Sequence, residues 1–202
     1  MSRFLFIFMG LCALVLGLYS ALQMKEPHQV QALWYEQPRA LAPFSLSDQH
    51  GRAFDLSRLK GKWTLLFLGY TSCPDICPTT LSRLAAVYPR LVEAAEAPVQ
   101  VALVTADPAR DTQAVLREYV AFFNPGFLAL RGEHVDLYPF TRQLGLMYQF
   151  DEHGDVSHSS SLVLVNPDGA VEAVIQPGEM GGLPVVDTEA LVSDFEVIAA
   201  GR

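Results

Sequence analysis

A long apolar run that leads directly into two cysteines constrains the fold of this chain more than any other feature. Residues Trp63 to Tyr70 are nearly all hydrophobic, which is typical of a central strand covered on both faces. The next segment contains Cys73 and Cys77, and apolar residues at helical spacing follow from Leu81. The sequence therefore predicts a buried strand, a cysteine-bearing loop and a helix in direct succession.

The two cysteines lie where thiol chemistry is favoured. Free backbone N–H groups and aligned peptide dipoles at a helix N-terminus stabilise thiolates. A four-residue spacing on a helix puts both sulfurs on one face, about one turn apart. Cys73 and Cys77 can therefore bind one soft metal ion or oxidise to a redox disulfide. Because the loop between them is so small, a disulfide there would be a poor structural staple, and we expect active chemistry instead.

The N-terminal segment is long and apolar enough to span a bilayer. No charged residue occurs from Phe4 to Leu22, and a helix of that length would extend about 28 Å. Arg3 precedes the segment and favours a cytoplasmic N-terminus. A cleaved signal peptide is the alternative, but a small residue is missing three positions before the candidate cleavage sites, where Leu18 or Tyr19 stands.

We predict three parts: a membrane anchor over residues 1–24, a tether over 25–42 and one folded domain over 43–202. The tether is polar and contains two prolines, and the domain is large enough to form a core without disulfides. The third cysteine, Cys12, falls in the anchor as a small hydrophobic residue. The net charge of −8 argues against a nucleic-acid partner, because there is no basic stripe for phosphates.

The remaining pattern predicts a mixed α/β domain with helices on both faces of the sheet. The expected elements are a hairpin around residues 48–51, strands over 99–104 and 127–130, helices over 111–123, 135–144 and 188–199, and a terminal hairpin around the turn at 166–169.

Three ordered motifs resemble those of one family. The segment from Gly69 to Leu81, GYTSCPDICPTTL, is similar to the signature of the Sco/SenC copper chaperones. Residues 105–112 (TADPARDT) resemble the second motif of that family, and residues 156–159 (VSHS) resemble the third. The resemblance implies a thioredoxin-like fold, an N-terminal transmembrane helix and copper delivery to the binuclear copper site of cytochrome c oxidase. The loop at 151–155 looks shorter than the acidic loop usual in the family.

By motif match, the resemblance makes Cys73, Cys77 and His158 the metal ligands, with Cu(I) or Cu(II) as the ion. Without the match, a turn or hydrogen-bonding role would be the first interpretation of His158. Soft thiolates with an imidazole suit Cu(I), and Cu(II) accepts the same set with added donors. A ligand on a separate loop suits a carrier, because it can move away to open the site.

Three further residues are candidates for a role beside the metal. Asp75 lies between the cysteines, where it can tune the thiolates or contact a partner, or simply favour a helix start. Asp107 and Arg110 can pair beside the cysteine loop, or form a structural turn before a helix capped by Asp111 and Thr112. His153 precedes His158 by five residues and is either a solvated loop residue, the favoured interpretation, or an auxiliary ligand. The remaining histidines, His28, His50 and His134, have no companion at metal-ligand spacing.

The main alternative is an enzyme, a thiol-disulfide oxidoreductase that reduces the cysteines of the oxidase copper site. Against it, three residues separate the two cysteines instead of the usual two. A thiol peroxidase is a third hypothesis, but Tyr70 stands where such enzymes place a threonine. We expect a bacterial inner-membrane protein with its domain in the periplasm. Its partners would be the copper-bearing oxidase subunit, a periplasmic copper donor and a thiol reductant.

Overall fold

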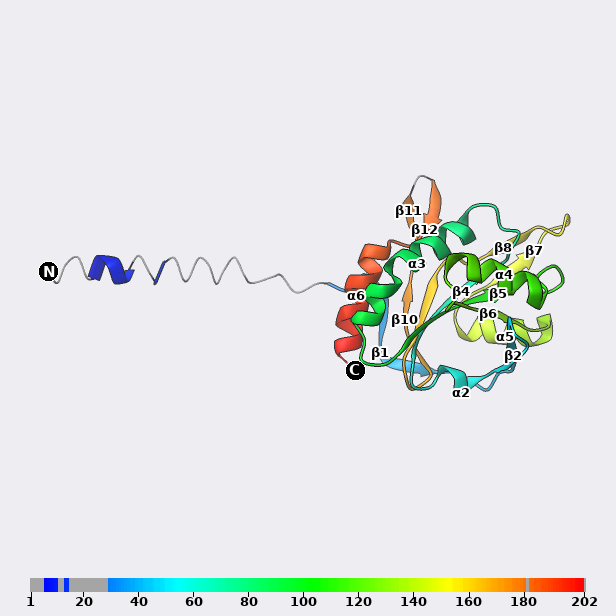
Figure 1. Cartoon of the computed structure of the whole chain (residues 1–202), viewed down its shortest axis with the longest axis horizontal. Coiled ribbons are helices and arrows are strands. Elements are labelled where there is room, and N and C mark those ends of the chain that lie inside the picture. Colours follow the sequence, from blue (N-terminus) through cyan, green and yellow to red (C-terminus); the bar gives the residue numbers. More distant parts are fainter. Residues whose placement is uncertain (1–5, 11–12, 15–28, 181, 202) are drawn as a thin grey trace.

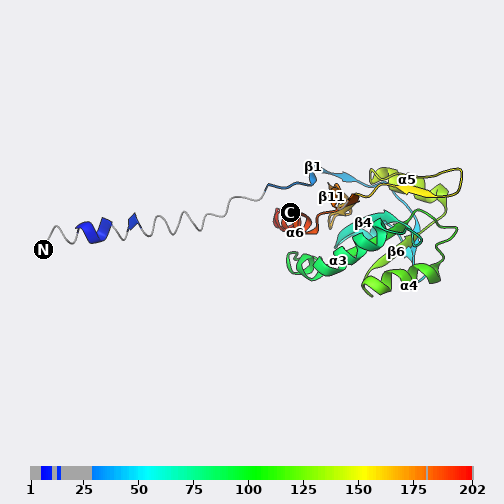
Figure 2. The same cartoon turned by 90° about the horizontal axis from the view of Figure 1, so that it is seen from above.

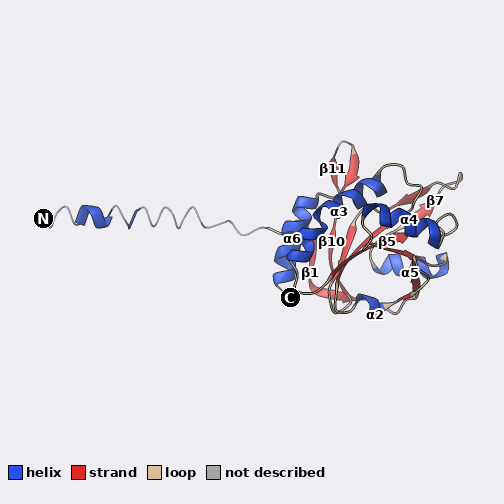
Figure 3. Cartoon of the chain, viewed as in Figure 1, coloured by secondary structure: helices blue, strands red, loops and turns tan. Residues whose placement is uncertain are grey.

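The computed structural model describes residues 6–10, 13–14, 29–180 and 182–201, and its folded part is built on a mixed sheet (Figures 1 and 3). The sheet has eight strands in the order β1-β10-β9-β4-β5-β6-β2-β3. The strands β4, β5 and β6 are parallel, and all other neighbours are antiparallel. The bounds are β1 Leu33–Ala40, β2 Leu46–Asp48, β3 Ala53–Phe54, β4 Trp63–Gly69, β5 Val99–Thr105, β6 Leu128–Arg131, β9 Leu162–Val165 and β10 Ala170–Ile175.

Helices cover both faces of this sheet, as the sequence predicts. In Figure 2, α3 and α4 lie on one side and α5 lies on the other. Every residue of β4 is buried, and its side chains alternate between the two resulting cores. Leu65 and Phe67 join the core that contains Cys77, while Leu66 and Leu68 join the core beneath α5. The helices are α2 Leu56–Leu59, α3 Ile76–Glu93, α4 Gln113–Phe123, α5 His134–Gln143 and α6 Thr188–Ala200.

Side-chain caps and one tight turn fix several element ends. The Thr112 hydroxyl accepts a hydrogen bond from the Val115 N–H and caps α4. Asp187 accepts from the N–H groups of Glu189 and Ala190 and caps α6. Between β9 and β10, Gly169 has φ of +84°, the left-handed conformation that glycine adopts at low cost. The terminal hairpin and the helix starts therefore follow the turn and cap signals of the sequence.

The structure begins its sheet earlier than the expected domain start at residue 43. Residues 33–40, expected in the tether, form β1, which pairs with β10 at the edge of the sheet. The Trp34 indole donates to the Glu172 carboxylate at 2.6 Å, and Asp194 accepts from the backbone N–H of Ala32 at 2.7 Å. Because β1 is an edge strand with mostly exposed side chains, it lacks the apolar alternation that predicts a strand.

Two small hairpins lie outside the main sheet. One joins β7 (Tyr148–Phe150) and β8 (Val156–His158), and the other joins β11 (Gly178–Met180) and β12 (Leu183–Val185). Both are two-stranded, so no ladder of backbone hydrogen bonds ties them to the main sheet. The β7–β8 hairpin carries His158, so the contacts that hold this hairpin against the rest of the domain also determine where His158 lies.

The expected anchor over residues 1–24 falls largely outside the described residues. Within residues 6–10, 13–14, 29–180 and 182–201, the structure contains no helix with the length and apolar character needed to cross a membrane.

Candidate metal centre

The cysteine loop joins the carboxyl end of β4 to the first turn of α3. Cys77 is the second residue of α3 and is completely buried, whereas Cys73 precedes the helix and is half-buried. Both thiols are free. The Cys77 N–H, which has no partner within the helix, donates to the Cys73 sulfur at 3.4 Å. The predicted strand, cysteine loop and helix succession is confirmed, with Cys73 in the loop rather than on the helix.

The two thiols have opposite tendencies to ionise. A hydrogen bond from the Cys77 side chain is the largest cause that lowers the pKa of Cys73 to about 4, against the effect of burial. The backbone N–H groups of Cys77 and Asp75 act in the same direction. The same thiol–thiol hydrogen bond, together with burial, raises the pKa of the Cys77 thiol. The pair therefore holds one proton on Cys77 and presents a thiolate at Cys73.

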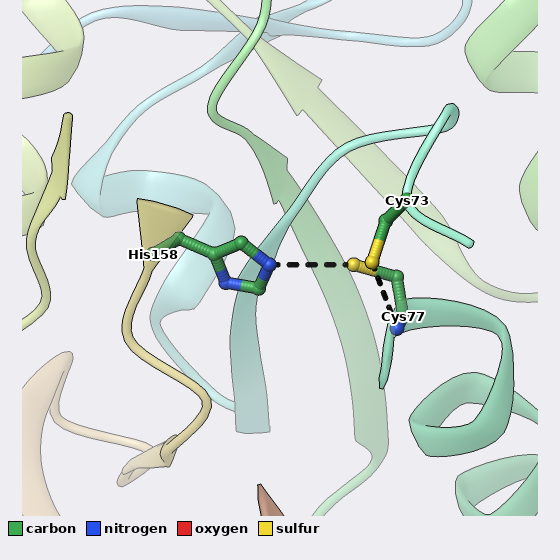
Figure 4. A group of neighbouring side chains, drawn as sticks. All are labelled: Cys73, Cys77 and His158. Atoms are coloured by element: carbon green, nitrogen blue, oxygen red, sulfur yellow. Dashed lines mark hydrogen bonds between the residues drawn. The ribbon is translucent and has the colours of Figure 1, made fainter. Parts of the chain in front are cut away.

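His158 reaches the cysteines from β8, on the other side of the site (Figure 4). Its Nε2 lies 3.6 Å from the Cys77 sulfur, and its Nδ1 lies 3.0 Å from the carbonyl oxygen of Ser159. Because a carbonyl can only accept, Nδ1 carries the proton and the lone pair of Nε2 faces the sulfurs. The rings of Tyr70 and Phe67 meet the imidazole edge to face, with centroids 5.8 and 6.2 Å away.

These three side chains form a group with metal-ligand geometry. The two sulfurs and the imidazole nitrogen all lie within 4.8 Å of one another. Donor atoms that share one ion at about 2.0–2.3 Å lie roughly 4 Å apart. Small side-chain rotations would therefore bring all three onto a single ion. Two thiolates and a neutral imidazole form a donor set that suits copper in either oxidation state.

Cys73 faces a surface cavity of about 360 Å³. Its wall includes His158, Tyr70 and Pro74 from the site, and Leu183 and Pro184 from the β11–β12 hairpin. A second cavity, of about 480 Å³, also includes His158 in its wall, together with residues of α5 and β7. A molecule from solution can thus approach Cys73 directly, whereas Cys77 is buried and does not line this cavity.

The three residues predicted to lie beside the metal have different surroundings in the structure. Asp75 is exposed at the N-cap of α3, makes no side-chain capping bond and lines the same cavity as Cys73. Asp107 is buried and accepts from the Arg110 guanidinium and from the Arg110 backbone N–H. Asp107 and Arg110 therefore pair, and the Asp111 N–H donates to the Asp107 carbonyl in a turn, so both arrangements considered from the sequence are present. Arg110 also donates to the Gly154 carbonyl at 3.2 Å.

Sequence reasoning missed the role of Asp111. Instead of capping the next helix, its buried carboxylate accepts from the Thr71 N–H, the Thr71 hydroxyl and the Thr105 hydroxyl. Both hydroxyl bonds measure 2.5 Å. Asp111 thereby holds the start of the cysteine loop. The available signal was that the Asp111 carboxylate comes soon after the buried strand β5. Because β4 and β5 are parallel and end at the same edge of the sheet, a residue that follows β5 can lie beside the loop that follows β4.

The other described histidines lie apart from this group. His134 begins α5 and its Nδ1 lies 2.8 Å from the Tyr148 hydroxyl. His153 is exposed in the turn between β7 and β8, and His50 lies in the turn between β2 and β3. His28 falls outside the described residues.

Comparison with known proteins gives one consistent match. The SCO1/SenC family model matches residues 35–192. A candidate copper-binding protein of Stutzerimonas stutzeri is 39% identical over 160 residues, which cover 77% of this chain and 78% of that protein. The SCO2-like protein of Rickettsia prowazekii is 31% identical over 173 residues, covering 81% of this chain and 84% of that protein. The copper-bound crystal structure of Arabidopsis thaliana ScoI superposes with a TM-score of 0.70 at 29% identity, covering 80% of this chain and 98% of that one.

Proposed function

The chain belongs to the SCO1/SenC family, and from this premise we propose that it binds copper through Cys73, Cys77 and His158 and delivers it to the binuclear copper site of cytochrome c oxidase. The observation that carries the proposal is the convergence of two sulfurs and one imidazole nitrogen within 4.8 Å. These donors come from two separate segments, the cysteine loop and β8. Their chemistry matches the preference of Cu(I) for soft ligands and of Cu(II) for the same set with added donors.

The protonation state of the group supports binding at neutral pH. Cys73 already carries a thiolate because its pKa is lowered to about 4, chiefly by the Cys77 thiol. The Nε2 lone pair of His158 faces the site because Nδ1 donates to Ser159. Only the Cys77 proton has to leave when copper binds, and the positive charge of the ion compensates for that loss.

The exposure of the ligands suggests an order of transfer. Cys73 faces the open cavity, so a thiolate of the acceptor protein can approach the copper ion there while Cys77 still holds it. Copper then exchanges one sulfur ligand for another without a change of oxidation state. His158 sits on a hairpin outside the main sheet, which allows it to leave as the acceptor takes over.

The test is copper binding by the purified, reduced protein and by His158→Ala. We expect one copper ion per wild-type molecule and a weaker, spectrally altered complex for the variant. His153→Ala is the matched control, because it removes an exposed imidazole from the turn of the same hairpin. Wild-type protein that emerges free of copper after exposure to a cuprous solution would contradict the proposal.

The proposed cellular setting is the periplasmic face of a bacterial inner membrane. Residues 1–24 would anchor the chain, the segment up to β1 would act as the tether, and the domain would meet the oxidase subunit outside the cytoplasm. A periplasmic copper donor would load the site, and a thiol reductant would keep the cysteines reduced. Protease treatment of spheroplasts tests this orientation, since the domain should be digested while a cytoplasmic marker stays intact.

A thiol-disulfide reductase is the second candidate, and the lowered pKa of Cys73 favours it. The Cys73 thiolate would attack a disulfide of the oxidase subunit, forming a mixed disulfide and releasing one thiolate. Cys77, after giving up its proton, would then attack Cys73, releasing the second thiolate and leaving a Cys73–Cys77 disulfide. The partner gains the two electrons that this pair loses. Turnover of a model disulfide by copper-free protein with an external thiol reductant distinguishes this activity from copper delivery.

A further inference from the structure

The segment after β5 contacts the start of the cysteine loop and the turn of the hairpin that carries His158. We define this segment, residues 105–112, as the brace. Its first end lies beside the cysteine loop, because the Ala106 N–H donates to the Gly69 carbonyl at 2.7 Å where β4 ends. Its later residues reach the turn between β7 and β8. No residue of the brace is itself among the three proposed ligands.

At the cysteine loop, the brace acts through Asp111. Its two carboxylate oxygens accept both the N–H and the hydroxyl of Thr71, which lies two residues before Cys73. The Thr105 hydroxyl donates to the same carboxylate, and it also accepts from the Asp107 N–H at 2.9 Å. Because Asp111 and Thr105 are completely buried, water cannot substitute for these bonds.

At the β7–β8 hairpin, the brace acts through Arg110. Buried Asp107 holds the Arg110 guanidinium, which donates in turn to the Gly154 carbonyl at 3.2 Å. The turn that contains Gly154 is ordered internally by Asp151, whose carboxylate accepts from the N–H groups of His153 and Asp155. A contact at Gly154 can therefore position the turn as one unit, and His158 follows it at the end of β8.

The hairpin needs such a contact. Its two strands pair only with each other in the described part of the chain, so the main sheet does not fix them through backbone bonds. Near its base, Tyr148 packs against the rings of Tyr138 and His134 on α5. At its tip, Arg110 supplies the hydrogen bond that joins it to the segment holding the cysteine loop.

We propose that the brace sets the spacing between the sulfurs and the imidazole, with Asp111 positioning the cysteine loop and Arg110 positioning the hairpin that carries His158. The proposal deepens the proposed function and rests on it for its effect on copper. Neither residue would touch the ion. Each acts through a segment that carries a proposed ligand, as groups outside a metal's ligand set commonly do.

The test compares Arg110→Gln with Arg90→Gln by Cu(I) competition against a chromophoric chelator. Arg90 is a matched control, because it pairs with Glu189 at 2.8 Å on the exposed surface between α3 and α6. We expect Arg110→Gln to raise the Cu(I) dissociation constant about tenfold. Arg90→Gln should leave it unchanged, and the unfolding midpoints of the two variants should be similar.

A double-mutant cycle separates positioning from general destabilisation. In a His158→Ala background the hairpin no longer supplies a ligand, so Arg110→Gln should change the dissociation constant by less than about twofold. Asp111→Asn should weaken copper binding in both backgrounds, because it acts on the cysteine side. An equal loss from Arg110→Gln with and without His158 would overturn the assignment of Arg110.

Amide hydrogen exchange of the copper-free protein tests the brace independently of copper. Arg110→Gln should accelerate exchange of the Gly154 and Asp155 amides, which are hydrogen-bonded within the turn, while the amides of β4 stay protected. Unchanged exchange in the turn would refute the brace even if copper binding were established. Faster exchange in a protein that binds no copper would instead support the brace and reject the proposed function.

Discussion

At the scale of single residues, two cysteines close in sequence have different environments. Cys73 lies in a loop at the mouth of a cavity, and Cys77 lies in the first turn of a helix within the core. One hydrogen-bonded proton between them makes the exposed sulfur the thiolate and the buried sulfur the thiol. The proposed nucleophile and the proposed transferable ligand are thus the same atom, Cys73 Sγ.

This difference predicts the pH dependence of alkylation by iodoacetamide. An unperturbed thiol ionises near pH 8.5, whereas the pKa of Cys73 is lowered to about 4. The thiolate persists at every pH above that value and is lost only as the pH falls through it. Cys73 should therefore react at nearly the same rate at pH 6 and pH 8, while Cys77 stays unlabelled in mass spectra. A rate that climbs roughly tenfold per pH unit over this range would contradict the assignment.

Cys77→Ala tests why the pKa of Cys73 is low, because it removes the thiol whose hydrogen bond is the largest cause of the lowered value. The labelling profile of Cys73 should then move to higher pH. His153→Ala, which alters an exposed residue outside the group, should leave the profile unchanged. If Cys77→Ala labels with the wild-type profile, the thiol–thiol hydrogen bond is not what stabilises the thiolate.

Gly69 predicts a second residue-scale effect. A Cβ at this position would lie 2.8 Å from the Cys77 sulfur and 3.1 Å from both Leu103 and Phe67. Gly69→Ala should therefore displace Cys77, lower the free energy of unfolding by about 1–3 kcal/mol and weaken copper binding. Chemical denaturation and chelator competition measure the two effects. Gly178→Ala is the control, because there is open space at the position of its Cβ. Gly61→Ala is not an equivalent control, because Gly61 has a φ of +74°, a conformation that favours glycine.

At the scale of elements, a regular pattern of buried apolar side chains was sufficient to predict a strand or a helix. The strand over 63–69 and the helices with apolar periodicity appear where the sequence predicts them, because burial on one or two faces dictates their pattern. The edge strand β1 and the hairpins β7–β8 and β11–β12 were missed. Their side chains are largely exposed or their strands have only three residues, so no periodic burial marks them.

The composition of the candidate site was predictable to a similar degree. Cys73 and Cys77 follow from their spacing, and His158 followed from a motif resemblance rather than from its own surroundings. The part played by Asp111 was not predictable, because an aspartate followed by a threonine before a helix suits a cap equally well. Only the parallel pairing of β4 with β5 brings it beside Thr71. Long-range contacts of this kind leave no local signature in the chain.

The cap of α6 gives a prediction that separates stability from copper chemistry. Asp187 accepts from two free N–H groups at the start of the helix. Asp187→Ala should lower the free energy of unfolding by about 0.5–2 kcal/mol, as measured by urea denaturation. Asp187→Asn keeps an accepting oxygen and should lose much less. Copper affinity should be unchanged in both variants, since α6 supplies none of the three proposed ligands; a parallel loss of affinity would contradict this separation.

At the scale of the whole molecule, copper and oxidation should have different effects on the fold. The proposed ligands link the loop before α3 to a hairpin 81 residues away in the chain. A bound ion thus connects two segments that the main sheet does not join through its ladders. A Cys73–Cys77 disulfide would instead close a loop within one segment and remove little entropy from the unfolded chain.

Thermal unfolding can measure this difference. A ligand that binds only the folded state, at 100 times its dissociation constant, stabilises it by about 2.7 kcal/mol. For a chain of this size that corresponds to a rise in midpoint of roughly 5–10 °C. Reduced wild-type protein should show this rise with Cu(I), and His158→Ala should show a smaller one at the same copper concentration. The oxidised protein should melt near the reduced copper-free form and gain nothing from copper, because both sulfurs are then blocked. A copper-induced rise that survives oxidation would mean that the ion stabilises the fold at residues other than the cysteine pair.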